Sequence, residues 1–333
     1  MTHGELMAAE IAEQPAALAR LLADGATATK DVRAAIERHD TRFVLFAARG
    51  TSDHAALYAK YLVEIELGLP AGLASASTMT VYGARPQMRG VLWIAVSQSG
   101  GSPDLVRSTE IARAGGALTV AVTNDPSSEL ARVAEYSVDV HAGPERAVAA
   151  TKTYTAELLA LHQLLLGTDA AAVPDACART LDFGDRAAAA APPLLSVDRL
   201  VTVGRGYSYA TAREGALKLM ETSYLMAQAF SGADLLHGPL AMVSPEVPVL
   251  AVTTPGHGAE ALLPVLAALE ERHASVLRIG PEDGLPVVLD GVPESLAPVV
   301  EILPLQQLAW RLALDRGSDP DAPGGLSKVT QTW

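Results

Sequence analysis

Five short apolar runs constrain the fold of this chain more than any other feature of the sequence. Each is followed by a turn containing glycine, serine or threonine and then by a helix-like segment, and they cover residues 42–48, 91–96, 118–122, 200–203 and 248–252. Strands that are apolar along their whole length are typical of parallel sheets covered by helices on both faces. We therefore predict an α/β fold, with ligands at the carboxyl ends of the strands.

One strand-turn-helix unit occurs twice in the chain. Residues 43–64 resemble residues 199–221, and both turns contain the pattern Arg-Gly-x-Ser. After a one-residue slip, Glu64 also matches Glu221. Two copies of one α/β unit are the economical interpretation of this repeat.

The repeat and the composition between its copies predict the domain organisation. The N-terminus is expected to form an amphipathic helix interrupted at Pro15, and the last segment a helix from Pro304 followed by a tail rich in Gly, Pro and Asp. The predicted parts are an N-terminal helix with the first domain at 1–170, a helical connector at 171–195, the second domain at 196–303, and a C-terminal helix and tail at 304–333.

Composition excludes several classes of function. A net charge of −13 argues against nucleic-acid binding, which needs basic surfaces. No basic segment precedes an apolar run at the N-terminus, and no run of about eighteen apolar residues occurs, so we expect neither export nor a membrane span. The only cysteine, Cys177, excludes an internal disulfide, is expected to be a small buried residue, and fits a reducing cytoplasm.

The histidines do not indicate a metal site. His54, His141, His237 and His257 show none of the short spacings that zinc enzymes use. We therefore expect no metal and no cofactor.

Two strand-to-helix turns have the composition of an anion-binding site. Residues 96–104 follow one apolar strand and contain three serines and two glycines, and Gly50, Thr51 and Ser52 form a second turn. Backbone N–H groups and hydroxyls at a helix N-terminus can bind a phosphate, although a structural turn with a serine cap has the same composition. A dinucleotide fold is disfavoured because no G-x-G-x-x-G motif opens a strand-helix unit.

Glu214, Lys218 and Glu221 are spaced so that they project from one face of a helix. Two carboxylates would then flank one ammonium group. Taken alone, this pattern also fits an exposed salt-bridge ladder, which contributes little to stability.

Seven motifs, spread over nearly the whole chain, resemble those of the SIS (sugar isomerase) family. They are EIAEQP, RGTS, SQSGGSPD, AVAATKTYTAEL, EGALKLMETSY, HGPLAM and DPDAPGGLSKVT. The resemblance is to the double-SIS isomerase half of glutamine-dependent glucosamine-6-phosphate synthase and to free-standing relatives that deaminate amino-sugar phosphates. It implies two flavodoxin-like SIS domains, each a parallel sheet flanked by helices, and a C-terminal tail over the active site.

The resemblance also implies roles for individual residues. Glu221 would move a proton between carbons 1 and 2 of the sugar, with Lys218 and Glu214 beside it. His237 would open the sugar ring from the partner subunit of a homodimer, and Lys328 would contact the open-chain carbonyl or form a Schiff base with it. The residues that would hold the sugar phosphate are Thr51, Ser52, Ser97, Gln98, Ser99 and Ser102.

Four positions depart from the pattern of the synthases. Gly101 replaces an acid, Ala150 a serine, and Leu236 a lysine, and Gly324-Gly325 replaces a basic and an amide residue. These positions would surround the substrate, so they bear on which sugar is bound.

The leading hypothesis is a hexosamine 6-phosphate isomerase/deaminase. No glutaminase-like segment precedes the repeat, and we therefore expect the chain to release ammonia rather than to use glutamine. Alternatives are a dehydratase of an N-acetylhexosamine 6-phosphate, in which the carbon-2 carbanion expels the 3-hydroxyl, a deglycase of fructosamine phosphates, and a sugar-phosphate sensor without activity.

Overall fold

The structure, a computed structural model, describes residues 3–280 and 283–328. The chain forms two compact units that are interleaved along the sequence. The first-sheet unit comprises residues 16–144 and 153–171, and the second-sheet unit comprises residues 3–15, 145–152 and 172–328. The consecutive domain boundaries expected from the sequence stay a prediction.

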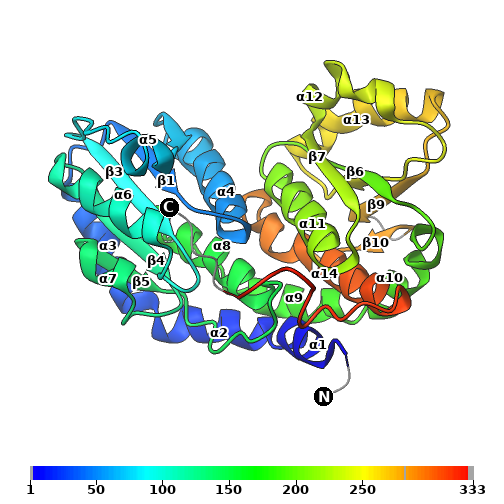
Figure 1. Ribbon diagram of the computed structural model, residues 1–333, viewed down its shortest axis with the longest axis horizontal. Coiled ribbons are helices and arrows are strands. Elements are labelled where there is room, and N and C mark those ends of the chain that lie inside the picture. Colours follow the sequence, from blue (N-terminus) through cyan, green and yellow to red (C-terminus); the bar gives the residue numbers. More distant parts are fainter. Residues whose placement is uncertain (1–2, 281–282, 329–333) are drawn as a thin grey trace. The chain divides into compact units, whose positions relative to one another are not determined.

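The first-sheet unit is a parallel sheet in the order β2-β1-β3-β4-β5, with helices on both faces (Figure 1). Its apolar centre includes Trp93, whose indole N–H donates to Thr109 Oγ1 at 3.1 Å. The strands are β1 (Phe43–Ala47), β2 (Ala71–Leu73), β3 (Val91–Val96), β4 (Leu118–Thr123) and β5 (Tyr136–Asp139). The helices are α2 (Gln14–Asp24), α3 (Ala26–Arg38), α4 (Thr51–Glu66), α5 (Ala76–Thr80), α6 (Pro103–Ala114), α7 (Glu129–Val133) and α8 (Lys152–Leu165).

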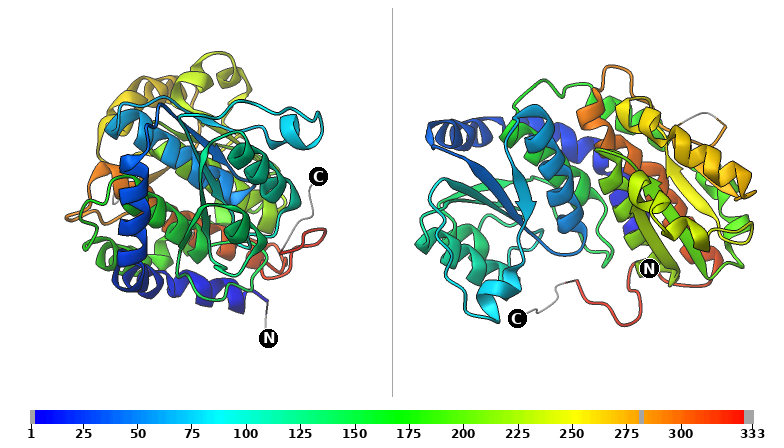
Figure 2. Two further views of the ribbon diagram at one scale, coloured as in Figure 1. Left: turned by 90° about the vertical axis from the view of Figure 1, so that its left-hand side faces the viewer. Right: turned by 90° about the horizontal axis from the view of Figure 1, so that it is seen from above.

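The second-sheet unit has the strand order β7-β6-β8-β9-β10, again parallel (Figure 2). The strands are β6 (Arg199–Gly204), β7 (Met226–Ser231), β8 (Val249–Val252), β9 (Val276–Gly280) and β10 (Leu285–Pro286). The α-helices are α1 (Glu5–Ala12), α9 (Val173–Leu181), α10 (Gly184–Ala190), α11 (Ser208–Ser223), α12 (Gly232–Leu236), α13 (His257–Glu271) and α14 (Ala297–Asp315). Short 3₁₀ turns are η1 (Pro192–Leu194), η2 (Pro239–Met242) and η3 (Glu294–Leu296).

Both sheets have the flavodoxin-like strand order, because β6 to β10 occupy the places of β1 to β5. The predicted α/β class with two helix-flanked parallel sheets is therefore confirmed, and each predicted apolar run is a strand. The strands missed from the sequence are β2, β5, β7, β9 and β10.

The repeat is confirmed at the level of single side chains. Gly50 and Gly206 both have a left-handed backbone, with φ of 55° and 61°. Ser52 Oγ donates to Glu157 on α8 at 2.8 Å, and Ser208 Oγ donates to Glu301 on α14 at 2.8 Å. In each unit, the turn after the first strand is thus tied to a buried carboxylate on the last helix.

The prediction that the last helix begins at Pro304 is wrong. Helix α14 begins at Ala297, and Pro304 lies inside it. Pro298 lies in the first turn of the helix. A proline is tolerated there because backbone N–H groups of the first turn have no intrahelical hydrogen-bond partner in any case. The expected break near Pro15 is confirmed, since α1 ends at Ala12 and Pro15 lies in the first turn of α2.

One further expectation is met within the described residues. Cys177 is a free, fully buried cysteine. Among residues 3–280 and 283–328, no helix combines the length and the apolar character that crossing a bilayer requires.

His162, in the middle of α8, is fully buried, and its ring nitrogens have no hydrogen-bond partner within the described part of the chain. Burial lowers the pKa of His162 to about 4. In the unfolded chain the His162 ring is protonated below about pH 6.5, whereas in the folded protein it stays neutral down to about pH 4. The free energy of unfolding therefore falls as the pH falls between these values. The expected loss is about 3 kcal/mol.

Urea unfolding of the wild type and of His162→Leu between pH 4 and pH 7 checks this expectation. The variant should lose about 3 kcal/mol less than the wild type over that range. Buried carboxyls such as Glu301, whose pKa is raised by burial, contribute equally to both curves. Parallel curves would show that His162 does not control acid stability.

Candidate active site

The two predicted phosphate-binding turns lie next to each other in the first-sheet unit. Strands β1 and β3 are neighbours and run in the same direction, so their carboxyl ends meet at one edge of the sheet. Thr51 and Ser52 begin α4 after β1, and the turn from Ser97 to Ser102 joins β3 to α6. The N-termini of two helices therefore converge there, as anion binding requires.

Gly100 shapes the turn after β3. Its φ is +58°, and a Cβ atom would lie 2.1 Å from Ser128 Oγ, so only glycine fits. Within the turn, Ser97 Oγ accepts from Gly100 N at 3.2 Å, and Ser99 Oγ accepts from Gly101 N at 3.3 Å. The turn is thus internally braced, while Gln98, Ser99 and Ser102 are partly exposed and accessible to a ligand.

The equivalent turn of the second-sheet unit already holds an anion of its own. It follows β8 and leads into α13, as the turn after β3 leads into α6. The Glu294 carboxylate accepts from Gly258 N at 2.9 Å and lies 3.0 Å from the His257 ring. This carboxylate therefore occupies the place that a ligand anion would take at the start of α13.

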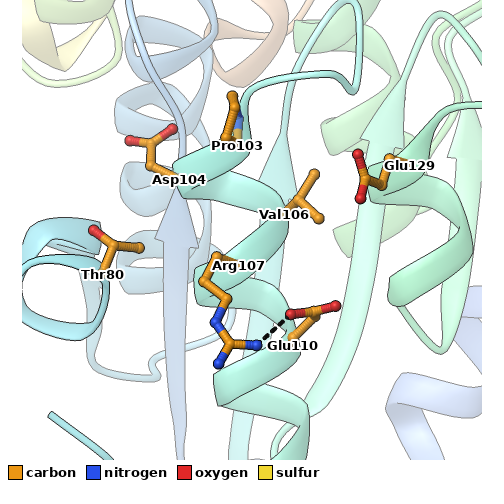
Figure 3. A pocket seen from close by; sticks show the side chains of 7 residues that line it. All are labelled: Thr80, Pro103, Asp104, Val106, Arg107, Glu110 and Glu129. Atoms are coloured by element: carbon orange, nitrogen blue, oxygen red, sulfur yellow. Dashed lines mark hydrogen bonds and ion pairs between the residues drawn. The ribbon is translucent and has the colours of Figure 1, made fainter. Parts of the chain in front are cut away.

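A hollow of about 480 Å³ on the outer side of α6 is not that site (Figure 3). Its ionised side chains are mostly acidic. Asp104 is paired with Arg49 at 2.7 Å, and Glu110 with Arg107 at 2.7 Å, while Glu129 adds a third carboxylate. This lining repels a phosphate, and none of the predicted phosphate-binding residues contributes to it.

The second-sheet unit brings Glu214, Lys218 and Glu221 together on one face of α11, as predicted. Lys218 Nζ lies 3.2 Å from Glu214 Oε1 and 2.5 Å from Glu221 Oε2. Glu214 and Lys218 are fully buried, whereas 23% of the Glu221 side chain is exposed. The exposed-ladder interpretation is therefore wrong for this group, which is a buried ion chain whose last carboxylate reaches solvent.

Lys218 is a permanent cation in this arrangement. Burial alone would lower its pKa, but the charges of Glu214 and Glu221 outweigh burial and raise the pKa above the ordinary value. Lys218 therefore cannot serve as a base at neutral pH. It can hold the Glu221 carboxylate in place through a charge-assisted hydrogen bond.

His237 does not join this group within one chain. Helix α11 packs on one face of the second sheet, where Thr202 Oγ1 donates to the carbonyl of Ala212. Leu235 of α12 packs on the other face, against Val201 and neighbouring residues, because successive side chains of a strand alternate between faces (Figure 1). His237 follows α12, is exposed, and forms no side-chain hydrogen bond or ion pair in the described part of the chain.

The C-terminal tail, in contrast, passes the end of α11. Tyr224 lies three residues after Glu221 in the sequence, and its Oη accepts a hydrogen bond from Gly324 N at 2.8 Å. Tyr224 adopts a left-handed conformation with φ of +53°, which is uncommon for an aromatic residue. Lys328 then forms an ion pair with Glu145 at 3.1 Å.

The described residues contain no group of three or more His, Cys, Asp and Glu side chains that could hold a metal ion.

Sequence reasoning missed three buried carboxylates, Glu145, Glu157 and Glu301. Glu157 and Glu301 could have been found by comparing the last helices of the two repeat units as well. Glu157 accepts a hydrogen bond from Ser52, and Glu301 accepts one from Ser208, the serine at the matching position of the second unit. Glu145 binds Thr151 N and Lys328, and no local pattern indicates its contact with a residue 183 positions away.

Comparison with known proteins places these features in context. A family model described as the SIS domain matches residues 39–167 and 194–290. The chain is 33% identical over 345 residues to glutamine–fructose-6-phosphate aminotransferase (isomerizing) of Pyrococcus horikoshii, covering 98% of this chain and 57% of that relative. It thus spans little more than half the length of the curated relatives it matches.

Two solved structures match nearly the whole chain. A protein of Silicibacter pomeroyi named as a phosphosugar isomerase is 36% identical, with a TM-score of 0.84 and coverage of 95% of this chain and 99% of that one. The C-terminal domain of glucosamine-fructose-6-phosphate aminotransferase from Francisella tularensis is 25% identical, with a TM-score of 0.86 and coverage of 97% and 99%.

Proposed function

Because the chain belongs to the SIS-domain family, we propose that it is an isomerase/deaminase of a hexosamine 6-phosphate. The observation that carries the proposal is the buried chain of Glu214, Lys218 and Glu221, which ends in an accessible carboxylate. Such a carboxylate, held by a permanent cation, is suited to remove a proton from carbon next to a carbonyl.

The reaction begins with the open-chain aldehyde of the amino sugar. Glu221 removes the proton from carbon 2, and the electrons of the C–H bond form the double bond between carbons 1 and 2 while the carbonyl π electrons move to oxygen 1, which takes up a proton from solvent. Return of a proton to carbon 1 leaves an imine at carbon 2. Water then hydrolyses the imine to the ketose phosphate and ammonia.

The remaining polar residues serve this step in different ways. Lys218 holds the Glu221 carboxylate in place, and Glu214 balances the charge of Lys218 inside the protein. Lys328 meets the carbonyl of the open-chain sugar, either as a hydrogen-bond donor or as a Schiff base. The phosphate is held by Thr51, Ser52, Ser97, Gln98, Ser99 and Ser102.

His237 opens the sugar ring, and we propose that it acts in the site of a partner subunit in a homodimer. The placement of α11 and α12 on opposite faces of the second sheet supports this proposal, and within the described residues His237 forms no hydrogen bond or ion pair with Glu221 of its own chain. A symmetric pair of chains would exchange these histidines in both directions.

Cys177, the only cysteine of the sequence, is fully buried, and burial raises the pKa of its thiol, so it does not act as a reactive thiolate. We further propose a cytoplasmic location, which agrees with this single reduced cysteine.

The proposal is tested by NMR and mass spectrometry of the products formed from glucosamine 6-phosphate and, separately, from N-acetylglucosamine 6-phosphate. Ammonia and a ketose phosphate from the first are expected. Loss of water from the second would establish the dehydratase instead. No reaction with either substrate or their epimers would overturn both and leave fructosamine-phosphate deglycation or sensing as the next candidates.

A further inference from the structure

Lys328 is held by one buried carboxylate. Its Nζ lies 3.1 Å from Glu145 Oε2 and 2.7 Å from the carbonyl oxygen of Ala147. The Glu145 side chain is 0% exposed, whereas 24% of the Lys328 side chain is exposed. The lysine therefore approaches from the solvent side and places its charge against a carboxylate that water does not reach.

Glu145 cannot move freely in response to Lys328. Its other carboxylate oxygen, Oε1, accepts from Thr151 N at 2.8 Å, at the start of α8. Both oxygens are thus engaged, one by the backbone and one by the lysine. Glu145 consequently ties the ammonium group of Lys328 to the backbone N–H of Thr151.

A second buried carboxyl makes the cation more important here. Glu10 accepts hydrogen bonds from the backbone N–H groups of Arg146 and Ala147. Its pKa is raised by burial and also by the negative charge of Glu145. Two acids that repel each other in a buried position are stabilised by nearby cations, and here the charge of Lys152 lowers the pKa of Glu10 while Lys328 pairs with Glu145.

The tail is fixed before it reaches this point. The Asp321 carboxylate accepts from Leu6 N at 3.0 Å and from Met7 N at 2.8 Å in the first turn of α1. Gly324 N is bound by Tyr224. Lys328 therefore arrives at Glu145 on a segment that is anchored at two earlier points.

We propose that Glu145 is a positioning residue, which holds the Lys328 amine at the place where it meets the sugar carbonyl. This inference rests on the proposed function, in which Lys328 contacts the open-chain substrate. Glu145 acts through Lys328 and touches no substrate itself.

The first test needs no substrate. Folded protein is treated briefly with an acetylating reagent, and mass spectrometry compares modification of Lys328 with that of the exposed Lys30. Because Glu145→Gln removes the negative partner, acetylation of Lys328 relative to Lys30 should rise roughly ten-fold. Glu145→Asp retains the charge on a shorter side chain and should give an intermediate rise.

The control variant is Glu271→Gln, an exposed carboxylate on α13 of the same unit, which should leave the ratio unchanged. If Glu145→Gln does not fold, Glu145→Asp must still raise the ratio above that of the wild type. An unchanged ratio in a folded Glu145 variant would overturn the proposal.

The second test measures turnover of the amino-sugar phosphate. Glu145→Gln should lower kcat roughly ten-fold while KM stays within about three-fold, and Glu145→Asp should recover part of kcat. A wild type that is inactive but protects Lys328 would overturn the proposed function and leave the Glu145 contact in place. An active wild type with an unchanged Glu145→Gln variant would overturn the role of Glu145 alone.

Discussion

Replacement of Glu221 by Gln is expected to lower kcat/KM on the amino-sugar phosphate about a hundred- to ten-thousand-fold, the usual contribution of a general base. Glutamine has nearly the same shape and can still accept a hydrogen bond from Lys218, but it cannot take a proton from carbon. Glu214 continues to pair with Lys218, so the fold should be retained. Steady-state kinetics and a thermal unfolding curve measure the two effects separately.

The repeat supplies a matched control for this experiment. Glu64 is the counterpart of Glu221 in the first-sheet unit and is also paired with a lysine one turn earlier, Lys60, at 2.6 Å. Glu64→Gln should leave kcat/KM within about two-fold of the wild type, since surface ion pairs contribute little. Equal losses in the two variants, or full activity of Glu221→Gln, would remove Glu221 from the mechanism.

The second large effect is on stability. Lys218→Met should lower the free energy of unfolding by about 3–5 kcal/mol, because it leaves the fully buried Glu214 carboxylate without its cation. For a chain of 333 residues the expected decrease in Tm is about 4–7 °C. Differential scanning calorimetry of the variant measures it.

Two further variants show whether the uncompensated charge is the cause. The double change Glu214→Gln with Lys218→Met removes the buried charge and should recover at least half of the lost stability. Lys60→Met, which breaks the exposed pair of the first-sheet unit, should cost less than about 1 kcal/mol. If Lys218→Met cost no more than Lys60→Met, the buried ion chain would not be what stabilises α11.

The parts of the fold that the sequence revealed are those that depend on local patterns. Central strands are apolar on both faces, so β1, β3, β4, β6 and β8 could be recognised from composition alone. An edge strand such as β7 has a mixed pattern, with Met226 and Gln228 exposed, and it resembles a loop. Pro304 suggested a helix start because proline is frequent in the first turn of helices, whereas here it lies inside the long helix α14.

The same distinction applies to the candidate site. The spacing of Glu214, Lys218 and Glu221 predicted their common face, because helical periodicity is local. Burial of Lys218 could not be predicted, since it depends on α14 packing over α11. Lys328 and Glu145 lie 183 positions apart, so their contact depends on the tertiary fold and cannot be predicted from a local sequence pattern.

The most direct test of the account is to follow deuterium placed at carbon 2 of glucosamine 6-phosphate and, separately, of N-acetylglucosamine 6-phosphate. NMR would record where the label lies after incubation with the wild type and with Glu221→Gln. The account predicts that the wild type removes the label from carbon 2 of the free amino sugar, to carbon 1 or to water, and that Glu221→Gln does not. A product that retains all its deuterium at carbon 2, or equal loss of the label with both proteins, would contradict enolisation by Glu221.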